Sequence, residues 1–370
     1  MRGFMVMRCV LKHHVCLCVL STAVLAGLAL ITAQTKVYAE SLNCNGIANT
    51  YGTGVPGNPS GDNPNKRIEC DGRGMKDLSG KRTIDMDKDL KPAVKVHGRT
   101  TNITIVGKLT VTDNGKRNTG PAIQVYNQGV LTLAGEVSIT GVHKGIVAES
   151  KGSVIVTRGV IGVREGGGAV IEVKNGGDVM LIKEVKVNGG GNNTGIEVGG
   201  TGGTVTLGGA SFTGVNKGIV FKGSGNVMGG AGGATINLAD GGVGIKMEGT
   251  GRDNATVMNM TINGGRGSVG AEVTGEGTLV LNKVTMTNVQ TGARVSNGKL
   301  TVMGGEIQAS GVGGTGAEVS GGDLMLSGGV KIAGTTMGLR VAGGSATMMG
   351  GKITGRWGWG YGGECGGWDG

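Results

Sequence analysis

Aspartate and glutamate are the candidate catalytic residues of this chain. Cleavage of a polysaccharide requires paired carboxylates, or a carboxylate clustered with His, Arg or calcium. The aspartates between residues 101 and 350 are far apart in sequence: Asp113, Asp178, Asp240, Asp253 and Asp323. Asp178 and Asp323 each precede an apolar strand residue, but Thr204 and Lys299 occupy the same place in intervening repeats. This mixture predicts a solvated corner and no catalytic acid.

Four glutamates form a second set, each placed between two apolar residues: Glu172, Glu197, Glu272 and Glu318. Gln124, Lys246 and Arg294 occupy the same slot in other repeats. A column of mixed outward charges is typical of one face of a parallel sheet. A catalytic base within this column is the alternative.

Histidines and glycine motifs add no further site. Outside the N-terminal segment only His97 and His143 are present, and His143 stands in a Gly-Val-Xaa-Lys-Gly turn where Asn216 stands in another repeat. A GxGxxG match begins at Gly311, but a strand pattern follows it where a dinucleotide site requires a helix. The calcium-binding nonapeptide pattern is absent. We therefore predict no catalytic residue, cofactor site or metal site, and no enzyme.

These residues are positioned by a repeat. An apolar-polar-apolar phrase after a glycine or turn recurs ten times, at spacings of 22 to 26 residues. Its first apolar residues are Ile123, Ile146, Ile171, Ile196, Ile219, Ile245, Ala271, Ala293, Ala317 and Leu339. A regular period of this length predicts a solenoid whose repeats are stabilised by stacking on their neighbours.

Each repeat contains three short alternating stretches separated by turns, for example Ile196-Glu197-Val198, Val205-Thr206-Leu207 and Ala210-Ser211-Phe212. Alternation with a period of two indicates strands, and helical spacing is not seen in this region. The predicted fold is all-β: a right-handed parallel β-helix of about ten or more coils, with three strands per coil of about 24 residues. This β-helix is predicted over residues 92–355.

Disorder is the alternative interpretation of this region, because glycine accounts for 81 of the 370 residues. The glycines fall between the strands, where the corners of a coil need positive φ or close backbone approach. This placement favours the solenoid. Four methionines at strand positions are predicted to fill the core: Met180, Met258, Met286 and Met325.

The N-terminus has the pattern of a signal peptide over residues 1–39. A basic start precedes an apolar run, and Val37-Tyr38-Ala39 provides small residues for cleavage after Ala39. An uncleaved membrane anchor is the alternative, and no other stretch is apolar enough to span a bilayer. We expect export through the inner membrane and no integral membrane segment in the mature chain.

Two cysteines bracket a loop rich in Gly, Asn and Pro. In an oxidising compartment, Cys44 and Cys70 are predicted to form a disulfide that staples an N-terminal cap over residues 40–91. Metal ligation is the alternative, but two thiols do not make a zinc site. Cys365 is left unpaired. Residues 356–370 hold all three tryptophans and predict an atypical tail, either frameshifted or disordered.

The formal net charge of +10 is spread among acids, and no basic run is interleaved with aromatic residues. Such interleaving is what single-stranded nucleic acid binding requires, so we expect no nucleic-acid partner. A basic exported protein is more compatible with attraction to anionic glycans or cell surfaces.

The signal peptide, the stapled cap and about ten coils of the Gly-[Ile/Ala]-Xaa-Val type together resemble the passenger region of Gram-negative autotransporters of the pertactin-like kind. The resemblance covers roughly residues 40–355. It implies display outside the cell and a role in adhesion, aggregation or immune interaction. It also implies a C-terminal translocator barrel, whose strand pattern this sequence lacks, so we expect a surface or extracellular location if a translocator acts and a periplasmic one otherwise.

The function expected from the sequence is that of an exported, noncatalytic scaffold, an adhesin that binds a protein or glycan of a host cell, the extracellular matrix or a neighbouring cell. A carbohydrate-active β-helix, either a polysaccharide lyase or a glycan hydrolase, is the alternative. A truncated passenger remnant without activity of its own is a third.

Overall fold

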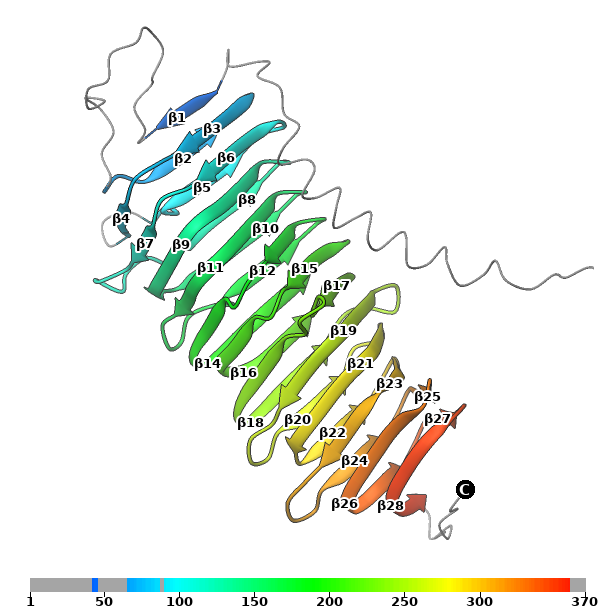
Figure 1. Cartoon of the computed structure of the whole chain (residues 1–370). Coiled ribbons are helices and arrows are strands. Elements are labelled where there is room, and N and C mark those ends of the chain that lie inside the picture. The colour runs from blue at the N-terminus through cyan, green and yellow to red at the C-terminus, as the bar shows by residue number, and fades with distance from the viewer. Residues whose placement is uncertain (1–41, 46–64, 87–89, 360–370) are drawn as a thin grey trace, which may run out of the picture. The chain divides into compact units, whose positions relative to one another are not determined.

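The computed structural model describes residues 42–45, 65–86 and 90–359. The chain divides into two units, Met1–Glu40 and Ser41–Gly370, and every described residue belongs to the second. This unit is an all-β, parallel β-solenoid of about 12 turns with ~24 residues per turn (Figure 1), as the repeat predicts. The described residues include no helix with the length and hydrophobicity needed to cross a membrane.

Parallel pairing between successive coils defines three sheets, which we name faces 1, 2 and 3 in the order in which each coil visits them. Some strands lie on one face only. On face 1 these are β2 (Ile68–Asp71), β5 (Val94–His97), β8 (Pro121–Tyr126), β10 (Lys144–Glu149), β12 (Ile171–Lys174), β20 (Val269–Val273), β22 (Thr291–Val295) and β24 (Thr315–Val319). On face 2 they are β3 (Gly74–Leu78), β6 (Thr101–Ile105), β13 (Asp178–Leu181), β15 (Gly203–Leu207), β17 (Gly225–Met228), β25 (Asp323–Ser327) and β27 (Ser345–Met348), and on face 3 they are β4 (Arg82–Asp85) and β7 (Leu109–Thr112).

Longer strands run through a corner of the coil. Those that pass from face 2 to face 3 are β9 (Val130–Val142), β11 (Ser153–Val163), β19 (Asn254–Asn263), β21 (Thr278–Val289) and β23 (Lys299–Ala309). Those that pass from face 3 to face 1 are β14 (Lys186–Gly199), β16 (Ser211–Phe221), β18 (Thr235–Met247), β26 (Val330–Val341) and β28 (Gly351–Trp359). Register shifts mark several of these corners, because the residues at the bend do not pair one to one.

The ten predicted anchors form one column on face 1. Ile123 pairs with Ile146, Ile146 with Ile171, and the column continues in register to Leu339. All ten side chains are buried. The prediction of the repeat and of its phase on face 1 is therefore confirmed. The interior is one continuous apolar cluster, and it includes the fully buried side chains of Phe212 and Phe221.

A glycine column beside these anchors explains the first position of the repeated phrase. Seven coils in succession place glycine immediately before the anchor: Gly195, Gly218, Gly244, Gly270, Gly292, Gly316 and Gly338. A Cβ atom there would strike a backbone oxygen of the next coil and an interior side chain from face 3. These glycines are needed for close approach, and none of them has the positive φ of a turn.

The N-terminal end differs from the predicted cap. β2, β3 and β4 already form a complete coil, since they pair in parallel with β5, β6 and β7. The solenoid thus begins at Ile68 and not at residue 92. Only β1 (Asn43–Asn45) departs from the pattern, by pairing antiparallel with β2, and the Cys44–Cys70 disulfide joins the two strands at directly opposed residues. The predicted signal peptide and its cleavage after Ala39 lie outside the described residues.

The C-terminal end also extends further than predicted. β28 remains in parallel register with β26 through the pairs Leu339–Trp357 and Val341–Trp359, so the coil pattern does not stop at residue 355. Backbone pairing can continue there because it does not depend on side-chain identity. Cys365 and the rest of the predicted tail lie outside the described residues.

The prediction for the methionines is correct for Met286 and wrong for the other three. Met286 is fully buried. Met180, Met258 and Met325 stand at outward positions of face 2 and are half-buried. Met180 and Met325 each lie between two buried residues, and Met258 lies between buried Val257 and exposed Asn259. Both neighbours of Met180 and of Met325 are apolar too, so the alternation that would have marked the outward residue is lost there.

Candidate functional site

The outward charges of face 1 neutralise one another. The slot between the apolar anchors forms a column in which Lys246, Glu272, Arg294, Glu318 and Arg340 follow on consecutive coils with alternating sign. Adjacent members approach to between 2.8 and 3.6 Å. The predicted column of mixed charges is confirmed, and its members neutralise each other in place of a ligand.

Glu172, in the same column, is the buried member. Burial alone would raise the pKa of this carboxyl, but ion pairs with Lys144 (2.8 Å) and Lys174 outweigh it and hold the pKa below its ordinary value. Glu172 is therefore ionised at neutral pH. A general acid needs the opposite shift, so the geometry does not favour a catalytic role for this residue.

Asp178 is the described carboxyl whose pKa is raised, and burial is the main cause. Its neighbours in the same column on adjacent coils are Ser153 and Thr204, and Ser153 Oγ donates a hydrogen bond to Asp178 Oδ2 at 3.4 Å. Glycoside cleavage requires a second carboxylate about 5–10 Å away, and neither neighbour supplies one. Across the described residues, no cluster of three or more His, Cys, Asp or Glu could hold a metal ion.

The predicted equivalence of Asp178 and Asp323 is wrong. Asp178 shares a column with Thr204, Asn226 and Thr256, whereas Asp323 pairs with Lys299, two residues further toward the start of the strand. The five-residue strands of later coils add one inward position that β13 lacks. Both aspartates still lie among uncharged or basic neighbours.

The corner between faces 3 and 1 is the most irregular part of the solenoid. Two single-residue corners, His143 and Gln290, are each flanked by longer ones. Residues 113–120 and 164–170 flank His143, and residues 264–268 and 310–314 flank Gln290. The corners of successive coils stack in a row along the solenoid, and a short corner between two long ones leaves a gap in this row. The repeat spacings carry this signal, because the 22-residue repeat that contains Gln290 lies between repeats of 26 and 24 residues.

The gap at His143 is bridged by an ion pair. Arg164 Nη1 lies 2.6 Å from Asp113 Oδ2, and the Asp113 side chain has no exposed surface. Arg164 Nη2 also donates to the carbonyl of Asn118 at 3.0 Å. Asn118 in turn donates through its amide to the carbonyls of Met86 and Lys91. This bridge could not be predicted from the repeat, since its ends are 51 residues apart and belong to coils that are not adjacent.

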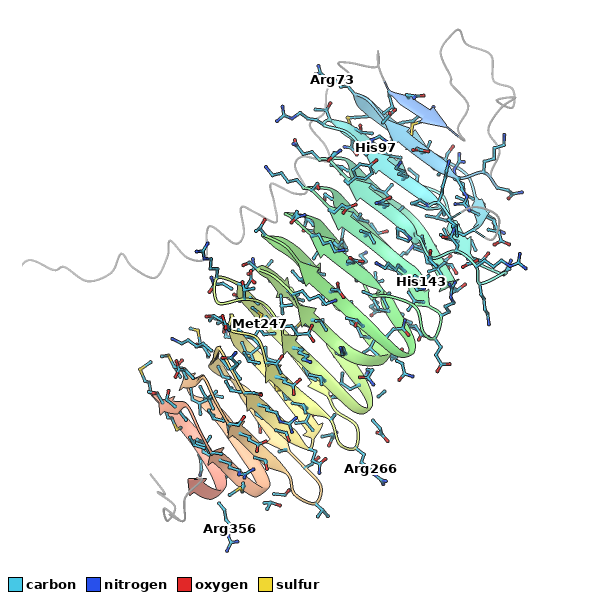
Figure 2. The ribbon with its side chains drawn as sticks, turned by 180° about the vertical axis from the view of Figure 1, so that it is seen from behind. Arg73, His97, His143, Met247, Arg266 and Arg356 are labelled. Carbon is cyan, nitrogen blue, oxygen red and sulfur yellow. A yellow bond between two sulfur atoms is a disulfide. The ribbon has the colours of Figure 1, made fainter. Side chains whose placement is uncertain are left out.

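His143 forms the short corner that this bridge spans, at the turn that the sequence predicts for it, and the charges of Arg164 and Asp113 both act on its imidazole. Its place in the coil is labelled in Figure 2. Burial lowers the pKa of its imidazole, and the charges of Arg164 and Lys144 lower it further, against an opposing effect of Asp113. The unfolded chain therefore takes up a proton at higher pH than the folded chain does, and stability falls as the pH drops below about 6.5.

We expect His143→Asn to remove this loss, because Asn216 occupies the equivalent turn and asparagine does not titrate. The measurement is the denaturation midpoint of both proteins between pH 7.5 and about pH 5. The variant should gain relative to the native chain as the pH falls. Parallel pH profiles for the two proteins would contradict the assignment.

The gap at Gln290 stays open. It forms a hollow of about 710 Å³ lined by Gly264, Gly265, Arg266, Gly267, Asn288, Gln290, Ser310, Gly311 and Val312. Gln290 is an exposed residue of this lining and donates from Nε2 to the carbonyl of Val312 at 3.2 Å. Four of the nine lining residues are glycines, so backbone groups as well as side chains are accessible there.

Two exposed side chains stand at the rim of this hollow. The backbone of Arg266 is fixed by hydrogen bonds to Asp240 Oδ1 (2.9 Å) and from the Gly241 N–H (2.7 Å), while its guanidinium forms no ion pair within the described residues. Figure 2 shows Arg266 at the outer edge of the corner row. Val312 is 98% exposed. We name this feature the corner hollow.

The GxGxxG match that begins at Gly311 contributes Gly311 and Val312 to the lining of the hollow. β24 begins within the match at Thr315, so a strand stands there as predicted and no helix N-terminus is present to receive a phosphate. The residues of this match thus belong to a corner of the coil and the start of β24, and not to a dinucleotide site.

The class of the protein is set by its architecture: it is a parallel β-solenoid. A scan against protein-family models, a search of curated proteins and a search of solved structures found no match, so the fold is assigned without a family.

Proposed function

We propose that this protein is an exported, noncatalytic β-solenoid that binds a protein or glycan of a host or neighbouring cell through the corner hollow. The observation that carries the proposal is the pairing, at one open concavity, of an arginine without an ion-pair partner in the described structure and a valine that is 98% exposed. Arginine is over-represented at binding surfaces because its fork recognises carboxylate and sulfate groups, and exposed apolar side chains provide contact area.

Export is proposed on two grounds. Residues 1–39 have the basic, apolar and small-residue order of a signal peptide. The Cys44–Cys70 disulfide fits an oxidising compartment. Adhesin-like display at the cell surface is part of the same proposal, with a periplasmic or extracellular location as the other destinations.

The test is binding of the purified chain to cells, matrix proteins and an array of anionic glycans, beside an assay for released reducing sugar. We expect binding without sugar release, and a loss of affinity of about tenfold in Arg266→Ala, which corresponds to one charge-assisted hydrogen bond. Arg252→Ala is the matched control, because Arg252 is an exposed arginine at a different corner. Release of sugar, or equal effects of the two variants, would refute the proposal.

A further inference from the structure

Two outward columns of face 2 carry almost no charge between β6 and β27. Asp77 of β3 continues the second column beyond β6, and Lys299 and Asp323 stand in a further outward column at the start of their strands. Eleven consecutive strands, from β6 to β27, present two columns of outward residues. The first column is Asn102, Val130, Ser153, Asp178, Thr204, Asn226, Thr256, Val280, Thr301, Met325 and Thr347. The second is Thr104, Thr132, Ile155, Met180, Thr206, Met228, Met258, Asn282, Met303 and Ser327.

This composition is unlike that of the other faces. Asp178 is the one ionisable residue in the two columns, whereas face 1 displays its alternating charges and face 3 displays Lys186, Glu306 and Lys331. The chain as a whole has a net charge of +10. The hydroxyl, amide and thioether groups of these columns are uncharged and mostly half-buried. Such groups suit a flat contact, because their burial does not remove an unpaired charge from water.

The size of the face is that of a stable interface. Ten intervals of about 4.8 Å and strands of four or five residues give roughly 50 Å by 15 Å, or about 750 Å². Standard protein–protein interfaces bury about 800 Å² on each partner. The five methionines of the columns add adaptable apolar contact, and Met303 is 43% exposed.

The periodicity of the face favours one occupant. A partner that covers the whole face must present side-chain rows about 4.8 Å apart over ten intervals, which is the spacing of the strands of a long sheet. A second copy of this solenoid has the same spacing and the same uncharged rows. Two such sheets can pack face to face about 10 Å apart, related by a two-fold axis in the plane between them.

We propose that face 2 is the contact surface of a homodimer, in which two copies of this chain pack their uncharged sheets against each other. The contact uses a different side of the coil from the corner hollow, which lies between faces 3 and 1. It leaves the hollow and the charge ladder of face 1 accessible on both copies. Dimerisation and ligand binding are therefore separable.

The experiment is sedimentation velocity of the full chain over a concentration series, with Met258→Lys as the test variant. We expect a dimer whose dissociation constant rises at least about tenfold in the variant, because a lysine would be buried opposite apolar or hydroxyl groups. Thr261→Lys is the matched control: it places the same charge at a half-buried outward position of the same strand, but on face 3. The control should dimerise like the native chain.

Salt provides a second measurement. Dimerisation through an uncharged face should be unchanged or strengthened at high ionic strength, whereas pairing of charged ladders would weaken. A native chain that is monomeric at all concentrations, equal effects of the two lysine variants, or dissociation by salt would each overturn the proposal. Circular dichroism of both variants confirms that the fold is retained. Arg266→Ala should leave the dimer intact whether or not it binds a ligand.

Discussion

Arg164→Leu is expected to lower the free energy of unfolding by about 3–5 kcal/mol, because it leaves a buried carboxylate without its cation. The Asp113 side chain has no exposed surface, and Arg164 Nη1 at 2.6 Å is its ion-pair partner. The same substitution removes the hydrogen bond to the Asn118 carbonyl. The loss should appear in the guanidinium denaturation midpoint of the full chain, and as faster hydrogen exchange in residues 113–120 and 164–170.

An exposed ion pair provides the control. Lys222 Nζ lies 3.0 Å from Glu197 Oε2, but the lysine side chain is 51% exposed, so Lys222→Met should cost less than about 1 kcal/mol. The double variant Asp113→Leu with Arg164→Leu should recover part of the loss, since no charge is then left unpaired. If Arg164→Leu and Lys222→Met cost the same, the bridge between the corners is not a stabilising element.

The solenoid could be predicted from sequence because its signal is repeated in every coil. The anchors from Ile123 to Leu339 recur often enough that their phase is set by comparison between repeats. The same comparison placed Glu172 and Arg294 in one column, and the pairing confirms it. Features that each coil repeats can be averaged, and features of a single coil cannot.

The features that could not be predicted belong to single coils or to contacts between coils. Val179, Met180 and Leu181 are all apolar, so only the register with β11 and β15 shows which of them points outward. The corner hollow depends on where extra residues are placed within a repeat. The unequal spacings reveal the extra residues, but they do not say at which of the three corners these residues lie.

The ends were mispredicted for a related reason. The first coil, which begins at Ile68, lacks the glycine-anchor phrase, and its strands are recognised only by their pairing with β5, β6 and β7. At the other end Trp357 takes the place of an anchor. A terminal coil stacks on one neighbour only, so its sequence is less constrained by the repeat.

Gly316→Ala is expected to destabilise the solenoid by about 1–3 kcal/mol, although it adds a single methyl group. The added Cβ would lie 2.5 Å from the Gly338 carbonyl oxygen of the next coil and 2.5 Å from Ile332 Cγ2. Neither atom can move away cheaply, because one belongs to the ladder of face 1 and the other to the packed interior. Chemical denaturation measures the loss, and hydrogen exchange should locate it in β24 and β26.

Gly162→Ala separates this steric effect from the general cost of replacing glycine in a strand. Gly162 lies in β11 without a positive φ, and the nearest heavy atom to an added Cβ is Asn188 Cβ at 3.5 Å. This variant should be neutral or gain up to about 1 kcal/mol, since alanine restricts the unfolded chain. Adding Ile332→Ala to Gly316→Ala should not restore stability, because the Gly338 oxygen still blocks the methyl group. Full rescue by Ile332→Ala would show that interior packing, and not the close approach of successive coils, fixes glycine in this column.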